Sequence, residues 1–571
     1  MPFFQNGMRN LTLEYNGKLT SVLNQILDNP FTDSQSIAER AGVDKNELLE
    51  IYAELKNNPV YSDKITYESR ASRSVSVFKD VTKIPDVLSV IDGTKKYCER
   101  LEIWLGLGCP YVCNHCFSAE FEGTDRAGYI AKRGEGQDRF RLVPHPKLRP
   151  DDKPISIEKL KQVLDESINP DKAFNVPYFL FSGGKEPFTP GTDRKVCEAV
   201  KYIKERAEHY GVKSPGVCIY TTGVGMHSSA REYVTKYVDS IRVSMDGAIA
   251  KVWEYQTHTI PDHVRHKINF KTLIENVLEL VVLRNKEKSD LKIRLAQLLL
   301  RVNYTEWKEM TKLAVLLGVD LLEFKRYIGW PDEVDKSEPP VRKLLEVALG
   351  IKAMMANNTI AEVIEQAELE PDTVALITEK LGKSEKQLIE ENLPKLTVLI
   401  EDTFKTDDSG KFMPFFHQTW DWKPEGQRAQ EAQVCQGRRP PTDAFSNKFP
   451  STCLARDMWM ILGPRGEIQV CTPMTHAGIV RDIVIGESRP EYIKGFVDDY
   501  DEDPLTNIYE NSRNTVCNID TRVCFYRCDH NGINVNWALQ KVKKDIEWGI
   551  LADQQPFDNN NDPYLKLVNR D

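Results

Sequence analysis

The sequence predicts an α/β protein whose central domain is a parallel β-sheet, with a helical module before it and a cysteine-rich region after it. Between residues 101 and 328, short apolar segments alternate with amphipathic segments of helical spacing. Strands of parallel sheets are buried on both faces and read as continuous apolar runs, as residues 178–181 do. Alternating strands and helices imply right-handed crossovers within one parallel sheet. Three cysteines within eight residues follow the first of these strands.

The expected strands and helices follow one another along the chain. Strands are expected at residues 101–105, 178–181, 217–222, 241–245, 291–302 and 320–328. Helices are expected at residues 157–168, 196–211, 228–240, 268–286 and 304–317. Ser156 is a suitable N-cap for the first helix, and Gly211 ends the second. Ligands of such sheets bind at the carboxyl ends of the strands, so functional residues are expected there.

Length and composition indicate a large soluble protein. The 571 residues would make about four domains of ordinary size, and 41% hydrophobic with 28% charged residues is ordinary. The net charge of −9 argues against a protein built mainly to coat nucleic acid. No signal peptide is expected, because the first residues contain no basic region followed by an apolar run. No membrane span is expected, because Gly318 and Asp320 interrupt the best apolar segment. The 12 cysteines are then expected to be metal or catalytic residues in a reducing cytoplasm.

Residues 1–75 predict a helix-turn-helix module. The segment Thr32-Asp33-Ser34 offers N-caps, and Gly42 provides a turn before a second helix. Residues 58–68 could add a wing, which gives a winged-helix-like module that binds DNA or a peptide; a plain helical cap is the alternative. Eight Lys or Arg against ten Asp or Glu disfavour DNA, which needs a basic face. Residues 76–100 are expected to be a linker.

The three cysteines after the first strand are candidate metal ligands. Cys109, Cys113 and Cys116 have the spacing Cys-x3-Cys-x2-Cys, with His115 before the third. Thiolates are soft ligands that suit iron–sulfur clusters, copper(I) or zinc. A 4Fe-4S cluster normally takes four cysteines, so three on one loop would leave one iron open to a small molecule. A structural zinc site is the alternative, with Cys98 or His115 as the fourth ligand.

Polar and glycine-rich motifs follow the next strands. The second strand leads into Ser182-Gly183-Gly184-Lys185-Glu186-Pro187, whose paired glycines let a ligand approach the backbone closely. The third ends in Thr221-Thr222-Gly223, the fourth in Ser244-Met245-Asp246-Gly247, and Asn303 follows the fifth. Each motif taken singly could be a cap or a turn. Together with the cysteines they predict one site at the carboxyl edge of the sheet.

These motifs, in this order, resemble those of the radical S-adenosylmethionine (SAM) superfamily. The resemblance implies a partial (β/α)6 barrel over residues 101–335 and a 4Fe-4S cluster on Cys109, Cys113 and Cys116. It also implies that SAM binds the open iron and is reductively cleaved to a 5'-deoxyadenosyl radical. The residues it implies in SAM binding are Gly183, Gly184, Glu186, Pro187, Thr222, Ser244, Asp246 and Asn303. Lys185 departs from the shortest form of the family's Gly-Gly-Glu-Pro motif.

The rest of the chain is expected to form an all-helical insert over residues 336–404, a small cysteine-rich domain over 405–540 and a tail over 541–571. Within residues 405–540, the sequence predicts a hairpin around residues 463–466. Its cysteine spacing resembles the SPASM/twitch extension of radical SAM enzymes. That resemblance implies an auxiliary 4Fe-4S cluster on Cys435, Cys453, Cys471 and Cys528. It leaves Cys517 and Cys524 unassigned; buried free cysteines or a zinc ribbon are the alternatives.

The resemblance implies an oxidoreductase that abstracts hydrogen from a substrate carbon, with a flavodoxin or ferredoxin as electron donor. A peptide or protein is the expected substrate, because a winged-helix-like N-terminal module resembles the leader-binding modules of peptide-modifying members. Two alternatives remain open. One is a radical SAM enzyme that acts on a small molecule, sugar or nucleotide. The other is a non-catalytic iron–sulfur sensor that regulates transcription through the helix-turn-helix module.

Overall fold

The computed structural model describes residues 13–28, 33–57, 96–98, 100–105, 112–113, 154–172, 174–182, 186–254, 258–259, 269–326, 341–400, 459–469, 493–512, 544–545 and 547–549. The chain divides into two compact units. The first comprises residues 1–99, 439–458 and 517–571, and the second comprises residues 100–438 and 459–516. None of the helices within the described ranges combines the length and the apolar character that a membrane crossing requires.

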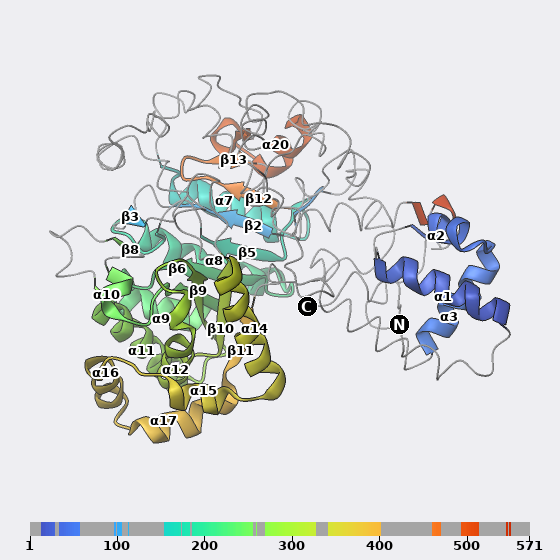
Figure 1. The fold of residues 1–571 in the computed structure, drawn as a ribbon. Coiled ribbons are helices and arrows are strands. Elements are labelled where there is room, and N and C mark those ends of the chain that lie inside the picture. The colour runs from blue at the N-terminus through green and yellow to red at the C-terminus, as the bar shows by residue number, and fades with distance from the viewer. Residues whose placement is uncertain are drawn as a thin grey trace, which may run out of the picture. The chain divides into compact units, whose positions relative to one another are not determined.

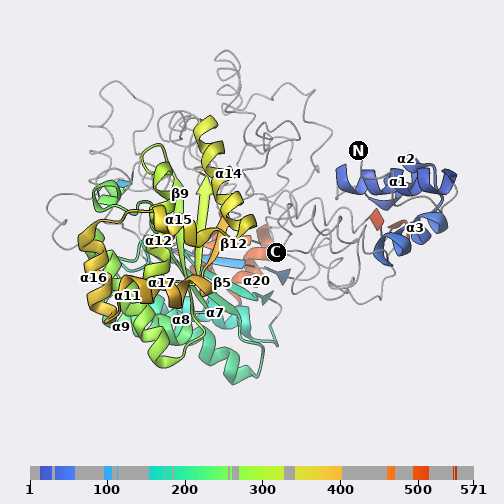
Figure 2. The same ribbon diagram turned by 60° about the horizontal axis from the view of Figure 1, so that its bottom comes forward.

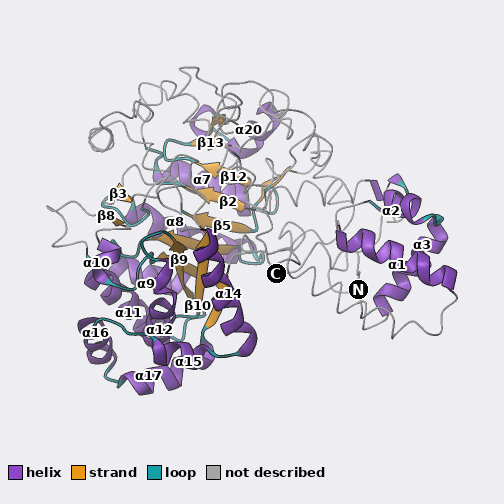
Figure 3. Ribbon diagram, viewed as in Figure 1, coloured by secondary structure: helices purple, strands orange, loops and turns teal. Residues whose placement is uncertain are grey.

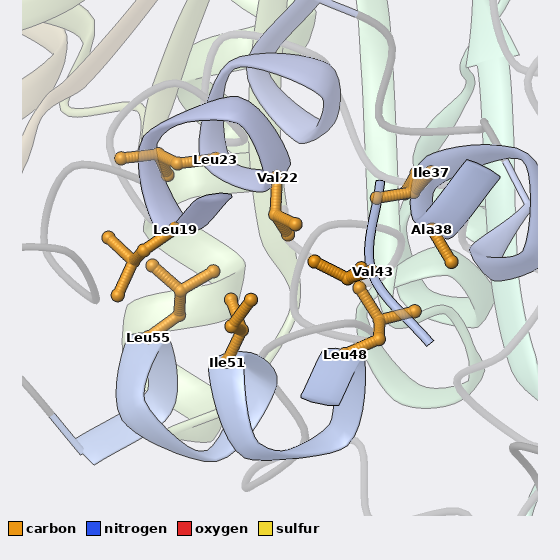
Figure 4. Close-up of a cluster of buried hydrophobic side chains, with 9 residues drawn as sticks. All are labelled: Leu19, Val22, Leu23, Ile37, Ala38, Val43, Leu48, Ile51 and Leu55. Atoms are coloured by element: carbon orange, nitrogen blue, oxygen red, sulfur yellow. The ribbon is translucent and has the colours of Figure 1, made fainter. Parts of the chain in front are cut away.

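Among its described residues, the first unit contains the helices α1 (Leu13–Asp28), α2 (Ser34–Ala41) and α3 (Lys45–Asn57). Asp33 caps α2 by accepting a hydrogen bond from the Ser36 N–H (3.0 Å). Gly42 ends α2 with a φ of 67°, a conformation that a residue without Cβ adopts without strain. The helices share one hydrophobic cluster (Figure 4), formed by Leu19, Val22, Leu23, Ile37, Ala38, Val43, Leu48, Ile51 and Leu55. The expected wing at residues 58–68 lies outside the described residues.

A C-terminal segment belongs to the same unit as these helices. The Ser34 N–H, at the start of α2, donates a hydrogen bond to Oδ1 of the fully buried Asp545 (2.7 Å). Lys544 Nζ lies 3.1 Å from Asp33 Oδ2, and Trp548 packs against the hydrophobic cluster. Residues from the expected tail therefore complete the N-terminal helical module.

The second unit is organised around a parallel sheet, drawn in orange in Figure 3. Its central strands are β2 (Arg100–Ile103), β5 (Tyr178–Phe181), β6 (Gly216–Thr221), β7 (Ser240–Ser244), β9 (Lys292–Leu299) and β10 (Leu321–Arg326). Each of these strands pairs in parallel with the next one in this series. Neighbours in sequence are thus neighbours in the sheet. This confirms the predicted α/β fold and the strand order of a partial (β/α)6 barrel.

Helices connect these strands and pack side by side along the sheet (Figures 1 and 2). They are α7 (Ile157–Ile168), α8 (Asp193–Tyr210), α9 (Ser228–Tyr237), α11 (Phe270–Glu287) and α12 (Trp307–Leu317). The predicted cap Ser156 accepts from the Lys159 N–H (3.0 Å), and Gly211 ends α8 with a φ of 64°. One face of the sheet is apolar and fully buried, with Phe179, Val217, Ile241, Ile293 and Leu322 on it.

Further strands extend the sheet at both edges. The predicted hairpin forms from β12 (Trp459–Leu462) and β13 (Glu467–Gln469), and β12 pairs in parallel with β2. β14 (Ile493–Phe496) follows β13 in antiparallel pairing. At the other edge, β11 (Thr397–Ile400) pairs in parallel with β10. The prediction of an all-helical segment over residues 336–404 is wrong at this point, because Thr397–Ile400 forms a sheet strand.

The other described elements are four longer helices before β11, a helix near the third antiparallel strand, and several short segments. Four helices precede β11: α14 (Val341–Asn357), α15 (Ile360–Gln366), α16 (Pro371–Leu381) and α17 (Glu385–Asn392). Helix α20 (Pro504–Ser512) begins at Glu166 of α7, whose carboxylate accepts from the Leu505 and Thr506 N–H groups (2.8 and 2.7 Å). The short elements are β1 (Lys96–Tyr97), β3 (Val112–Cys113), β4 (Phe174–Asn175), β8 (His258–Thr259), α10 (Ala250–Val252) and the 3-10 turns Tyr304–Glu306, Leu393–Lys395 and Val497–Asp499.

Candidate active site

The segment that carries Cys109, Cys113 and Cys116, called the cysteine segment below, follows β2 in the chain. Cys113 lies in β3, which pairs antiparallel with β8, so that Cys113 is opposite His258. The segment after β2 therefore runs beside the segment that follows β7. Several predicted site residues lie outside the described ranges: Cys109, Cys116, Gly183, Gly184, Cys435, Cys453, Cys471 and Cys528. The predicted residues whose side chains are described are Glu186, Pro187, Thr222, Ser244, Asp246 and Asn303.

Glu186 joins the carboxyl ends of β5 and β6. Its carboxylate is buried and accepts two hydrogen bonds at Oε2 from Thr222, one from the N–H and one from Oγ1, each 2.7 Å long. At Oε1 it accepts from the Thr221 hydroxyl and from the Phe188 N–H (3.2 Å). An ionised carboxylate has about four lone-pair sites, and these four donors take them all. An added ammonium group would therefore compete with the two hydroxyls, since hydroxyls rotate and the amides do not.

Glycines let the loop after β6 approach the loop after β5. Gly223 has a φ of 82°, and its N–H donates to Thr221 Oγ1 (2.9 Å). A Cβ on Gly225 would lie 2.0 Å from the backbone oxygen of Phe188, so no larger residue fits without a backbone shift. Asn276 of α11 donates to the carbonyl oxygens of Gly223 and Val224 (3.0 and 2.8 Å). The loop that carries Thr222 is therefore held on both sides.

Asp246 and Asn303 fasten the ends of β7 and β9 to each other. Asp246 Oδ1 accepts from the Leu298 N–H (2.7 Å). Asn303 is fully buried, and its Nδ2 donates to the carbonyl oxygens of Asp246 (2.6 Å) and Leu298 (2.8 Å). Its Oδ1 accepts from the Leu300 N–H (2.7 Å). The amide of Asn303 is thus engaged with the backbone, as the turn interpretation of this residue requires.

Two glutamates that the sequence analysis did not single out hold the loop after β7. Glu306 Oε2 accepts from the Ala248 N–H (2.8 Å), and Glu370 Oε2 accepts from the Ala250 N–H (3.1 Å). Burial raises the pKa of Glu306 to about 7, against the lowering effect of the backbone N–H groups. The two contacts span 58 and 120 residues of sequence, so no local pattern could have revealed them.

A third glutamate joins β2 to β5 near the start of the cysteine segment. Glu102 is buried, and its Oε1 accepts from Trp104 Nε1 (2.8 Å) and from the Ser182 hydroxyl. Ser182 directly precedes Gly183 and Gly184, the glycine pair of the motif that follows β5. Each pair of neighbouring strand ends among β2, β5 and β6 is therefore linked by a buried carboxylate. The links bring the predicted motifs into register along one edge.

The sequence matches no protein-family model and no curated relative. Among solved structures, the chain is similar to Streptococcus suis SuiB bound to the precursor peptide SuiA, with 12% identity and a TM-score of 0.36 over 74% of this chain and 67% of that one. It is also similar to native anSMEcpe with bound AdoMet, with 12% identity and a TM-score of 0.37 over 79% of this chain and 97% of that one. A further anSMEcpe structure, with bound AdoMet and Cp18Cys peptide, has 11% identity and a TM-score of 0.34 over 79% of this chain and 96% of that one. At this level of similarity the chemistry of the site rests on the residues described above.

Proposed function

We propose that this protein is a radical SAM oxidoreductase with a SPASM/twitch-like auxiliary domain, which modifies a peptide or protein. One observation carries the proposal. The cysteine segment and the three strand-end motifs follow β2, β5, β6 and β7, which are consecutive neighbours in one parallel sheet. Their carboxyl ends therefore meet at one edge, where ligands of such sheets bind.

The donor set fits the proposed cofactor. Cys109, Cys113 and Cys116 supply three thiolates within one segment, which can hold three irons of a 4Fe-4S cluster and leave one iron for SAM. When bound, this cluster would supply the electron that cleaves the SAM sulfonium and yields a 5'-deoxyadenosyl radical. A second 4Fe-4S cluster is proposed on Cys435, Cys453, Cys471 and Cys528.

The chain's own residues would bind and orient SAM. In this proposal the Glu186 carboxylate accepts a hydrogen bond from the SAM amino group, beside the backbone of Gly183, Gly184 and Pro187. The SAM amino group competes with the Thr222 hydroxyl for this carboxylate. Ser244 ends β7 at the same edge and is a proposed contact for the ribose or the carboxylate. Asp246 and Asn303 act as positioning residues in this scheme, because their hydrogen bonds join the ends of β7 and β9. A flavodoxin or ferredoxin in the cytoplasm would reduce the cluster.

The helical module is the proposed docking site for the peptide. The exposed side of α3 carries Asn46, Leu49 and Glu50, and 40% of Leu49 is exposed. Between Lys45 and Leu55, α3 carries Glu47, Glu50 and Glu54 against Lys45 alone, and this excess of carboxylates would repel a phosphate backbone, whereas DNA binding needs Lys and Arg aimed at phosphates. The same face suits an apolar or basic side chain of a peptide.

Reductive cleavage of SAM tests this function directly. The wild-type protein, reconstituted anaerobically with iron and sulfide, should form 5'-deoxyadenosine from SAM and dithionite. A variant with Cys109, Cys113 and Cys116 all changed to Ala should not. The buried free cysteine Cys197 lies in α8, so C197A is the matched control and should keep the activity.

The helix-turn-helix module also favours a second candidate, an iron–sulfur sensor that binds DNA without turnover. The same assay separates the two candidates. A wild-type protein that holds a cluster but forms no 5'-deoxyadenosine, and whose duplex DNA binding weakens with salt, would be the sensor.

A further inference from the structure

The two faces of the parallel sheet differ in kind. The face that carries Phe179 and Ile241 is fully buried and apolar. The opposite face carries charged side chains from three neighbouring strands: Arg242 of β7, Arg294 of β9, and Glu323 and Lys325 of β10. The strand register places them on one face, since Arg242 pairs with Arg294 and Arg294 pairs with Leu321, two residues before Glu323. We call these four residues the cationic cluster.

The cluster is not a packed core. In closed (β/α) barrels the interior is filled by layers of branched apolar side chains. Here the side chains of Arg294 and Lys325 keep 25% and 23% of their surface exposed, while Glu323 keeps 5%. The cations are therefore within reach of a ligand on this face of the sheet, and the carboxylate between them is buried.

The two arginines of the cluster have few partners among the described residues. Glu323 lies 3.5 Å from Arg294 through Oε2 and 3.5 Å from Lys325 through Oε1. Arg242 stacks on the Tyr220 ring, 4.1 Å from its centroid, and forms no ion pair within the described part of the chain. The Nε–H groups of Arg242 and Arg294 are buried and donate to no acceptor among the described residues. Within the described part of the chain, two guanidinium groups thus share a face with one carboxylate, and a buried N–H that lacks an acceptor is costly.

The cluster reaches the edge of the sheet where the site lies. Ser244 is two residues beyond Arg242 on β7 and on the same face, and it pairs with Ala296, which also pairs with Glu323. Lys325 pairs with Leu298, whose N–H is bound by Asp246. The cationic cluster is therefore continuous with the strand ends that carry the predicted SAM residues.

We propose that the cationic cluster binds an oxyanion of the substrate, with Arg294 and Arg242 as its donors and Glu323 as the internal group it competes with. Guanidinium groups match carboxylates and phosphates with two parallel N–H donors, which makes them suited to this recognition. A peptide substrate would supply a carboxylate, and a nucleotide or sugar would supply a phosphate ester. The inference deepens the proposed function, on which it rests for the identity of the ligand as a substrate.

Small oxyanions test the cluster in the full-length protein. Glutarate binding can be measured by saturation-transfer NMR and inorganic phosphate binding by 31P line broadening, at matched ionic strength. Wild-type protein should bind one or both, R294Q should bind at least about tenfold more weakly, and E323Q should bind more tightly because the competing carboxylate is gone. The side chain of Arg194 on α8 is 86% exposed and pairs with Glu198, so R194Q is the matched control and should bind as wild type does.

The outcomes are distinct. Stronger glutarate binding assigns a carboxylate and stronger phosphate binding assigns a phosphate ester. No binding by wild type, or equal binding by wild type, R294Q and E323Q, would overturn the inference. Displacement of the anion by saturating SAM would also overturn it, since the cluster would then belong to the SAM site. Formation of 5'-deoxyadenosine without substrate should be unchanged in R194Q, and its absence in wild type would refute the proposed function instead.

Discussion

The Glu186 carboxylate and Thr222 are joined by two hydrogen bonds to one oxygen atom, from the Thr222 N–H and from its hydroxyl, both 2.7 Å long. The backbone bond fixes the ends of β5 and β6 relative to each other. The hydroxyl bond can be given up without moving the backbone. The pair therefore combines a permanent link with a contact that a ligand can replace.

Substitutions at this pair should separate stability from SAM binding. T222V removes the hydroxyl bond to the carboxylate and should cost about 1.5–3 kcal/mol in the free energy of unfolding. It should leave SAM affinity near the wild-type value, because the oxygen it vacates is available to the amino group. E186Q removes the charge and should weaken SAM binding at least about tenfold, or about 1.4 kcal/mol. Urea unfolding and SAM titration check both values, and a T222V protein that cannot bind SAM would contradict this assignment.

Removing the Asn303 side chain should loosen the ends of β7 and β9. N303A leaves the Leu300 N–H and two carbonyl oxygens without their amide partner in a buried site, and each unsatisfied group costs about 1–3 kcal/mol. Hydrogen exchange at the Leu298 and Leu300 amides should speed up, along with a lower free energy of unfolding. N303D retains an acceptor for the Leu300 N–H but has no donor for the two carbonyl oxygens. Its free energy of unfolding should lie between those of wild type and N303A, or below both. Unchanged exchange in N303A would show that the links are dispensable.

The stability contributed by Glu306 should fall as pH rises. Its pKa is raised from 4.5 to about 7, so the folded state holds its proton more tightly than the unfolded state. The favourable contribution is complete below pH 4.5 and is lost as pH rises through about 7, for a total of about 3 kcal/mol. E306Q cannot ionise and should lack this loss. The difference between wild type and E306Q in urea unfolding, measured from pH 4.5 to 8, isolates it from other carboxyl groups.

Asp545 should stabilise the N-terminal helices although it lies at the other end of the chain. D545A removes the buried acceptor for the Ser34 N–H and should cost about 1–3 kcal/mol in the stability of α2. D545N keeps an acceptor oxygen and should cost less. K544A removes an ion pair whose lysine is 59% exposed, so it should change stability by at most about 0.5 kcal/mol. Faster hydrogen exchange in α2 of D545A, compared with K544A, is the expected readout.

Iron content should reveal a second cluster. After reconstitution, the triple variant of Cys109, Cys113 and Cys116 should still hold about four irons per chain on Cys435, Cys453, Cys471 and Cys528. C197A should hold as much iron as wild type. An iron-free triple variant, or one that holds zinc alone, would rule out the auxiliary site.

Local sequence signals determined the helices, strands and caps of the described parts of the barrel and of the N-terminal helical module. Ser156, Gly211 and Asp33 act on residues within one turn of themselves, so their roles are readable from the chain alone. The order of the six central strands followed as well, because right-handed βα crossovers usually place consecutive strands side by side in one sheet. The motifs at the strand ends could be located for the same reason.

Only the tertiary structure decided which partners those residues have. Glu306, Glu370 and Asp545 bind backbone groups 58, 120 and 511 residues away, and such pairings leave no periodic trace in a sequence. The strand at Thr397–Ile400 was missed because four residues after a run of helices carry too little pattern to show that a sheet edge lies beside them. The cationic cluster could not be predicted from the sequence either, since Arg242, Arg294 and Glu323 share a face only once their strands are in register. Contacts across the sheet depend on register and packing, which are properties of the whole fold and not of any one segment.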